Sequence, residues 1–192
     1  MKAPLIVVSG LPRSGTSMLM QMLEAGGVPV MDDGIRPPDV SNPRGYYEVE
    51  RVKRLHKEVD KSWLADGAGK ALKVISFLLE YLPDSLSYQV ILMHRPLKEV
   101  FASQNRMLDE LARERGNAAE ESLIKSYEDH LANMRRVLAS RPCFSTLPVN
   151  YQDVLSQPAK EAVRIAHFLG RELDTARMAQ VVDPQLYRNR FE

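Results

Sequence analysis

A loop with two glycines joins an apolar run to an amphipathic segment near the start of the chain. Residues 5–8 read Leu-Ile-Val-Val, a β-branched run that is typical of a buried parallel strand. Residues 14–25 then place methionine and leucine at helical spacing until two glycines end the pattern. A buried strand that is followed at once by a helix favours an α/β fold, which leaves the chain few architectures.

The rest of the chain repeats this alternation of strands and helices. Strands are expected at 71–75, 89–93 and 144–149, and helices at 47–61, from 96 to about 111, at 118–139 and at 158–169. We find no internal repeat and no linker, and 192 residues suit one domain with a sizeable core. The sequence therefore predicts a single α/β domain over residues 1–192, with a central parallel sheet flanked by helices in three layers.

Composition and charge exclude several classes of protein. Apolar residues make up 44% of the chain and charged residues 27%, as in folded proteins rather than disordered ones. A formal net charge of +1 argues against a broadly basic nucleic-acid binder. The single cysteine, Cys143, cannot form an intramolecular disulfide, which favours a reducing compartment. We find neither an apolar run long enough for a membrane span nor a signal-peptide pattern, so a cytoplasmic location is expected.

The loop at residues 9–17 reads Ser-Gly-Leu-Pro-Arg-Ser-Gly-Thr-Ser. A loop that opens into a helix directs backbone N–H groups and the positive end of the helix dipole at one point, where an anion can bind. The glycine spacing is that of the Walker A P-loop, but Thr16 replaces its lysine and the cation has moved to Arg13. We interpret the segment as a P-loop for an anion other than a magnesium triphosphate. The alternative is a glycine-containing turn with a solvated arginine.

A second anion site is predicted where the strand at 89–93 ends. Arg95 follows this strand, and Ser103 lies on the face of the next helix that is turned to the sheet. The two side chains can converge on one phosphate outside the carboxyl ends of the strands, where α/β proteins bind ligands. The alternative is a buried serine that bonds back to its own helix, with the arginine merely paired to an acid.

Together these segments resemble the sulfotransferases that use 3′-phosphoadenosine 5′-phosphosulfate (PAPS), short bacterial members included. Residues 12–17 are similar to their 5′-phosphosulfate loop, Pro-(Lys/Arg)-Ser-Gly-Thr-Thr, and Arg95 with Ser103 has the spacing of their 3′-phosphate site. Residues 151–155, Tyr-Gln-Asp-Val-Leu, and the Phe-Leu-Gly at 168–170 resemble the family's Tyr-Glu-Asp-Leu…Phe-Leu-Gly stretch. The resemblance covers most of the chain, and it implies a P-loop-type fold.

The resemblance also implies a PAPS-dependent sulfotransferase that has PAPS as co-substrate and needs no metal. It assigns the 5′-phosphosulfate to the loop residues Pro12, Arg13, Ser14, Gly15, Thr16 and Ser17, and the 3′-phosphate to Arg95 and Ser103. Arg13 would stabilise charge on the bridging oxygen as the sulfuryl group leaves. Lys73 matches the family's strand-end lysine and would support the leaving group. The sequence does not identify the acceptor, which the chemistry requires to be a hydroxyl or an amine.

The general base has several candidates, because residues 73–75 lack the histidine that cytosolic members carry on this strand. In the tyrosyl-protein branch the base is a glutamate in an acidic pair after the first helix. Asp32-Asp33 occupies that place, so Asp33 is the first choice for the base. Glu48 is the second choice, at the end of a stretch that resembles short bacterial members, and His56 is the third. A plain turn is the alternative interpretation of the acidic pair.

Two other functions stay open on the sequence alone. One is a small-molecule kinase, against which the missing Walker lysine argues. The other is a non-catalytic or degenerate adenine-nucleotide-binding P-loop protein, which the missing histidine would suit. Residues 29–46 are rich in proline and predict a mobile loop. The chain is short for the family, so either the acceptor site is open or the second subunit of a homodimer completes it. A nucleic-acid partner is not expected.

Overall fold

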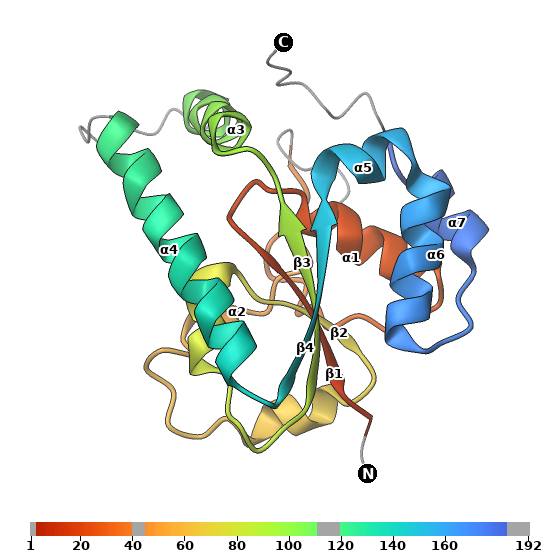
Figure 1. Ribbon diagram of the computed structural model, residues 1–192. Helices are drawn as coiled ribbons and strands as arrows, with labels where there is room; N and C mark the ends of the chain where they lie inside the picture. The colour runs from red at the N-terminus through yellow and green to blue at the C-terminus, as the bar shows by residue number, and fades with distance from the viewer. Residues whose placement is uncertain (1–2, 40–44, 111–119, 184–192) are drawn as a thin grey trace.

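Residues 3–39, 45–110 and 120–183 are described by the computed structural model shown in Figure 1. Within them the strands are β1 (Leu5–Gly10), β2 (Ala71–Lys73), β3 (Tyr88–His94) and β4 (Phe144–Asn150). The α-helices are α1 (Thr16–Ala25), α2 (Glu50–Lys53), α3 (Leu97–Glu110), α4 (Glu120–Ser140), α5 (Tyr151–Ser156), α6 (Pro158–Leu169) and α7 (Thr175–Gln180). Two 3₁₀ helices cover Ser62–Gly67 and Ser76–Tyr81.

The four strands form one parallel sheet in the order β2-β1-β3-β4. β1 is buried along its whole length, as its apolar run predicted. Because side chains alternate across a strand, Ile6 and Val8 enter one apolar cluster while Leu5 and Val7 enter another on the opposite face. A strand that is apolar on both faces needs helices on both faces to bury it.

Helices cover both faces of this sheet (Figure 1). On one face α1, α6 and α7 contribute Leu19, Ile165 and Met178, each with no exposed surface. On the other face α4 packs against the 3₁₀ helix Ser76–Tyr81, and Leu138 joins an apolar cluster with Leu64 and Leu79 from the two 3₁₀ helices. The arrangement of helix, sheet and helix confirms the predicted α/β fold with a central parallel sheet.

The helix expected at 47–61 is wrong over most of its length. Only α2, Glu50–Lys53, is helical there, and the chain then turns as the amide of Glu58 donates to the carbonyl of Arg54 at 2.9 Å. Asp60 accepts a hydrogen bond from the amide of Ser62 at 2.9 Å, which begins the next 3₁₀ helix. Side chains of this type offer the backbone bonds that compete with a continuous helix. The sequence interpretation also missed the short helices α5 and α7.

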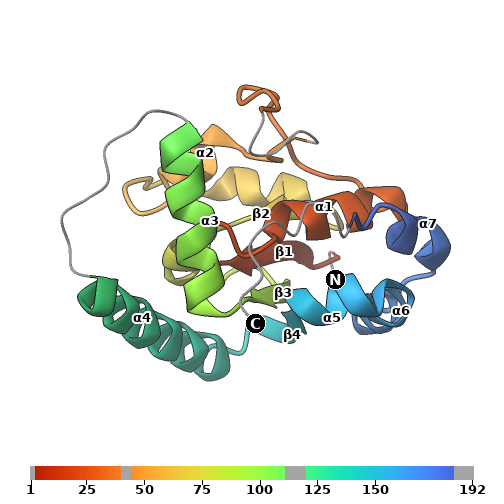
Figure 2. The ribbon, with the colours of Figure 1, turned by 90° about the horizontal axis from the view of Figure 1, so that it is seen from above.

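The carboxyl ends of all four strands share one edge of the sheet, the upper edge in Figure 1. β1 lies between β2 and β3, so the chain leaves β1 toward one neighbour and later returns on its other side. Ligands of α/β proteins bind in the crevice at such a switch point. Figure 2, which looks down on this edge, shows α1, α3 and α5 around the ends of β1 and β3.

Parts of four predictions fall outside the described residues. The expected helices from 96 to about 111 and at 118–139 each have an end among residues 111–119, which the structure does not describe. The other two are the expected mobile loop, at residues 40–44, and the expected single domain, at residues 1–2, 111–119 and 184–192. Among the described residues no helix is both long and apolar enough to cross a membrane. Nor does this part of the chain gather three or more histidine, cysteine or acidic side chains into a group that could hold a metal ion.

Candidate active site

The turn from β1 into α1 is closely packed around its two glycines. A Cβ atom at Gly10 would lie 2.5 Å from Oγ of Ser14 and 2.8 Å from the carbonyl oxygen of Met93. Gly15 has a φ of 105°, and a Cβ atom there would lie 2.5 Å from the ring of Tyr151. Gly15 is also the N-cap of α1, which has no side-chain cap. The first-turn amides of a helix lack acceptors within the helix, so an anion is a suitable partner for them.

Arg13 lies on this turn in a strained backbone conformation. Its φ is 68°, which costs a non-glycine residue about 1–2 kcal/mol. Nε of Arg13 donates to Oγ of Ser103 at 3.1 Å, although 90 positions separate the two residues. Nη1 of Arg95 donates to the carbonyl oxygen of Arg13 at 3.1 Å. The structure thus joins residues that the sequence assigned to two separate anion sites. The positive φ of Arg13 is a backbone strain of the kind that clusters at functional sites.

Arg95 is buried directly after β3, with only 6% of its surface exposed. Its Nε donates to Oε2 of Glu99 at 3.0 Å, and its guanidinium carbon lies 4.3 Å from the ring centroid of Tyr151. Nε2 of Gln152 donates to the other oxygen of Glu99 at 2.9 Å. The alternative interpretation, an arginine paired with an acid, therefore describes only one edge of Arg95. The other edge reaches the turn between β1 and α1.

Lys73 brings a second kind of cation to the same turn from the end of β2. It is 8% exposed, its Nζ lies 3.4 Å from Oγ of Ser17, and it donates to the carbonyl oxygen of Tyr46. Burial lowers the pKa of Lys73 to about 8, although the nearby Glu48 carboxylate opposes the shift. The amine is therefore still mostly protonated at pH 7, and it places its charge beside the first turn of α1.

Glu48 is a half-buried carboxylate among three cations. Its Oε1 lies 3.0 Å from Nη1 of Arg36 and 3.7 Å from Nζ of Lys73, and its Oε2 lies 3.1 Å from Nζ of Lys53. Burial by itself raises the pKa of Glu48, but the three cations outweigh burial, so the pKa lies below its ordinary value. Glu48 is thus ionised at neutral pH and sits beside the lysine that reaches α1.

Asp33 faces solvent on the same segment. Its two oxygens accept hydrogen bonds from the amides of Glu50, at 2.5 Å, and Ile35, at 3.0 Å, and these bonds lower the pKa of the carboxyl group. Asp32 likewise accepts from the amide of Gly34 at 3.0 Å. The acidic pair therefore forms the turn that was its alternative interpretation. Among the described residues no hydrogen bond or ion pair joins Asp33 to the turn between β1 and α1.

The other predicted residues of the loop line the same turn. Oγ of Ser14 is buried without a hydrogen-bond partner among the described residues, which costs about 1–3 kcal/mol for such a group. Thr16 is buried and Pro12 is half-buried beside it. A bound anion would satisfy the Ser14 hydroxyl, so the turn fits a phosphate or sulfate group. His56, the third candidate for the base, is exposed, and its ring meets the edge of Tyr81 at 6.1 Å.

Sequence reasoning missed Arg36, Glu99 and Gln152. Glu99 had a usable signal, because it lies four residues after Arg95 on an expected helix, the spacing of a helical ion pair. Gln152 was assigned to a stretch that supported the fold alone. Arg36 stacks over the Tyr46 ring, its guanidinium carbon 3.3 Å from the ring centroid, and no local pattern announced this contact.

The site as a whole combines three cations with the ionised carboxylate of Glu48. Arg13, Arg95 and Lys73 gather around the uncapped N-terminus of α1, and Glu48 lies against Lys73. Guanidinium groups that flank backbone amides suit a ligand with more than one phosphate-like group. An ionised carboxylate next to such a ligand can accept a proton from a nucleophile. The arrangement therefore suits group transfer from an anionic donor.

A comparison with known protein families finds one that matches this chain. The model of the family described as "Sulfotransferase domain" matches residues 3–191, which is nearly the whole chain. A comparison with curated proteins finds no match.

Several solved structures resemble the fold. Sulfotransferase STF1 from Mycobacterium tuberculosis H37Rv has a TM-score of 0.60 and 18% identity, and the match covers 95% of this chain and 71% of that one. The sulfotransferase domain of the Synechococcus PCC 7002 olefin synthase has a TM-score of 0.52 and 18% identity, covering 99% and 85%. Mouse sulfotransferase SULT7A1, complexed with PAP, has a TM-score of 0.52 and 15% identity, covering 93% and 62%. At these identities the likeness shows the fold alone.

Proposed function

The chain belongs to the sulfotransferase domain family, and on this premise we propose that it moves a sulfuryl group from PAPS to an acceptor hydroxyl or amine. The observation that carries the proposal is the direct contact between the two expected phosphate sites, from Nε of Arg13 to Oγ of Ser103. PAPS carries a phosphosulfate on one ribose carbon and a phosphate on another. A donor with two anionic groups on one nucleoside matches two adjoining basic sites.

Each anionic group of the donor has its own set of partners in this proposal. The amides at the start of α1, with the Ser14, Thr16 and Ser17 hydroxyls, bind the 5′-phosphosulfate. Arg95 and Ser103 bind the 3′-phosphate. A hydroxyl can donate one hydrogen bond and accept others, so Ser103 can serve the phosphate while it still accepts from Arg13. The mouse neighbour that is complexed with PAP, the desulfated donor, supports this choice of nucleotide.

Arg13 and Lys73 stabilise the leaving group. The acceptor oxygen or nitrogen forms a bond to sulfur while the bond from sulfur to the bridging phosphate oxygen breaks, and negative charge grows on that oxygen. Arg13 sits on the turn itself and Lys73 lies 3.4 Å from Ser17, so both cations can face this oxygen. Fixed charges that meet developing charge lower the barrier without reorganising in the transition state.

We propose Glu48 as the general base in preference to Asp33. The acceptor must lose a proton as it attacks, and the base has to lie near the phosphosulfate to take it. Glu48 is one contact away from Lys73, which itself reaches α1, whereas Asp33 spends both oxygens on backbone amides at the surface. The proton of the acceptor therefore passes to the Glu48 carboxylate. The desulfated donor leaves with the former bridging oxygen as an unprotonated phosphate oxygen.

The wild-type protein should bind 3′,5′-adenosine bisphosphate at least about tenfold more tightly than AMP, because Arg95 and Ser103 add charge-assisted contacts to the 3′-phosphate. Isothermal titration calorimetry of the two nucleotides measures this ratio. ATP with Mg²⁺ serves as the comparison for a kinase, and it should bind no better than AMP. Equal affinity for the bisphosphate and AMP would remove the second phosphate site. Tight binding without transfer from PAPS to any acceptor in a broad panel would favour the non-catalytic alternative.

Gly15→Ala should weaken binding of the bisphosphate at least about tenfold. The added methyl group would collide with the Tyr151 ring, so either the turn or the ring must move away from the phosphate position. Gly27→Ala is a matched control, because Gly27 also has a positive φ, 93°, but no atom lies within 4 Å of the added Cβ. Both variants carry the backbone cost, seen as a lower melting temperature. Only Gly15→Ala should bind the bisphosphate more weakly. A similar loss of affinity in Gly27→Ala would contradict the packing argument.

A further inference from the structure

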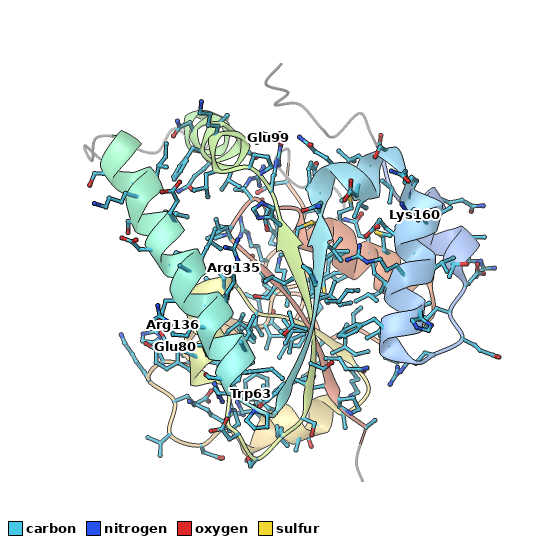
Figure 3. The ribbon with its side chains drawn as sticks, viewed as in Figure 1. Trp63, Glu80, Glu99, Arg135, Arg136 and Lys160 are labelled. Carbon is cyan, nitrogen blue, oxygen red and sulfur yellow. The ribbon has the colours of Figure 1, made fainter. Side chains whose placement is uncertain are left out.

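Glu99 is a buried carboxylate whose two oxygens are both engaged across the site. It lies in the first turn of α3, is 2% exposed, and is labelled in Figure 3 near the carboxyl edge of the sheet. One oxygen accepts from Nε of Arg95 at 3.0 Å, and the other accepts from Nε2 of Gln152 at 2.9 Å. The carboxylate thus ties the start of α3 to α5.

The contacts of Arg95 carry this restraint to the turn between β1 and α1, residues 11–15. We call it the phosphate turn, because the proposed function assigns the 5′-phosphosulfate to it. A guanidinium group is planar, so a fixed Nε on one edge and a stacked ring on one face set the direction of its remaining N–H groups. Glu99 supplies the edge and Tyr151 the face, with the guanidinium carbon 4.3 Å from the ring centroid. Nη1 then donates to the carbonyl oxygen of Arg13 at 3.1 Å.

The bond to this carbonyl is important because the Arg13 backbone is strained. With a φ of 68°, Arg13 would relax toward ordinary backbone angles if nothing held its carbonyl. Such a relaxation would rotate the peptide that joins Arg13 to Ser14, whose amide donates to the carbonyl oxygen of Leu11 at 3.1 Å within the same turn. The shape of the turn that leads into α1 would then change. The chain of contacts Gln152–Glu99–Arg95–Arg13 therefore runs from α5 to the turn.

We infer that Glu99 is a positioning residue for the phosphate turn: it orients Arg95, which holds the Arg13 carbonyl and so keeps the turn shaped for the 5′-phosphate. The inference rests on the proposed function, because it takes this turn as the nucleotide site. It goes beyond that function because the effect of Arg95 then extends from the 3′-phosphate to the 5′-phosphate. AMP, which has no 3′-phosphate, reports on that second effect alone.

The charge of Glu99 and its contacts with Arg95 and Gln152 have opposite expected effects on AMP affinity. A carboxylate near an anion site repels the anion, so loss of its charge alone should tighten AMP binding. Loss of its position should weaken AMP binding. Glu99→Gln and Glu99→Leu remove the same charge, but only glutamine keeps an oxygen for Arg95 and an amide that Gln152 can meet after a flip. The two variants therefore separate the two effects.

The experiment is calorimetry of AMP with the full chain and these variants. We expect Glu99→Leu to lower AMP affinity at least about fivefold, and Glu99→Gln to keep it within about twofold of wild type or to tighten it. Gln152→Ala, at an exposed position where folding is not endangered, should lower AMP affinity by about two- to threefold because it frees one side of Glu99.

Glu161→Leu is the matched control. Glu161 is another helical carboxylate, 4% exposed and paired with an arginine three residues along, but it lies on α6 away from the turn. Its replacement should cost a similar amount of thermal stability and leave AMP affinity unchanged.

Each outcome bears on one claim. Equal AMP affinity in Glu99→Leu and Glu99→Gln, or a loss in Glu161→Leu as large as that in Glu99→Leu, would overturn the positioning role. If Glu99→Leu does not fold, unchanged AMP affinity in Gln152→Ala would overturn it as well. A wild-type protein that binds neither AMP nor the bisphosphate would contradict the proposed function and also the inference that rests on it. If the wild-type protein binds AMP and the bisphosphate, and Glu99→Leu and Gln152→Ala keep the wild-type AMP affinity, only the inference is contradicted.

Discussion

Replacing Glu48 by glutamine should lower sulfotransfer at least about a hundredfold, the scale on which enzymes lose rate without their general base. Nucleotide affinity should stay the same or increase, because the change removes a negative charge from a cluster of three cations. The variant keeps the size of the side chain and its hydrogen-bonding oxygen. Initial rates with PAPS at saturation, together with calorimetry of the bisphosphate, separate the loss of turnover from any change in binding.

Asp33→Asn is the matched control for this prediction. It makes the same chemical change at the carboxylate that the sequence put first, but that side chain is exposed and bonded to two backbone amides. Its effect on turnover should stay within about threefold, with a small loss of stability because the amide can accept fewer hydrogen bonds. A hundredfold loss in Asp33→Asn with an active Glu48→Gln would reverse the assignment. It would mean that the 32–35 turn opens and folds back over the donor.

Replacing Arg13 by alanine should lower turnover by about a hundredfold to a thousandfold, as the loss of one donor to developing charge does in other group-transfer enzymes. The loss should appear mainly in kcat, since the charge on the bridging oxygen grows only in the transition state. The fold should survive because alanine meets the same positive φ as arginine does. Arg13→Lys should restore much of the rate, since a lysine supplies the charge without the planar fork.

Arg13→Gly provides the control for the backbone. It removes the same side chain as Arg13→Ala but relieves the strain at a φ of 68°, so it should be more stable by about 1 kcal/mol. The two variants should nevertheless turn over equally slowly. If Arg13→Gly had a much lower turnover rate than Arg13→Ala, the strained conformation of the turn would contribute to catalysis beyond the charge of Arg13. If both kept more than about a third of the wild-type rate, Arg13 would have no role in the chemistry.

The local patterns of the sequence predicted a large part of this fold. Each of the four strands was expected within a few residues of its observed bounds, because a β-branched run that ends at a glycine or a polar residue is a local signal. The helix at 47–61 failed because the chain turns directly after α2, where the amides of Lys57 and Glu58 both donate to the carbonyl oxygen of Arg54.

The turn between β1 and α1, with Arg13 and the glycines on both sides of it, is contiguous in the chain, so the sequence alone predicted an anion-binding loop there. The strand order β2-β1-β3-β4 is not a local property, and it alone brings Lys73 and Arg95 to opposite sides of that turn. The choice of Glu48 over Asp33 was decided in the same way, because both are acids in one irregular segment and only the fold puts one of them beside Lys73. Glu99 and Gln152 come from helices more than 50 positions apart, and the sequence carried no sign of their contact. A short pattern can specify which groups a chain offers, but the packing of the sheet decides which of those groups meet.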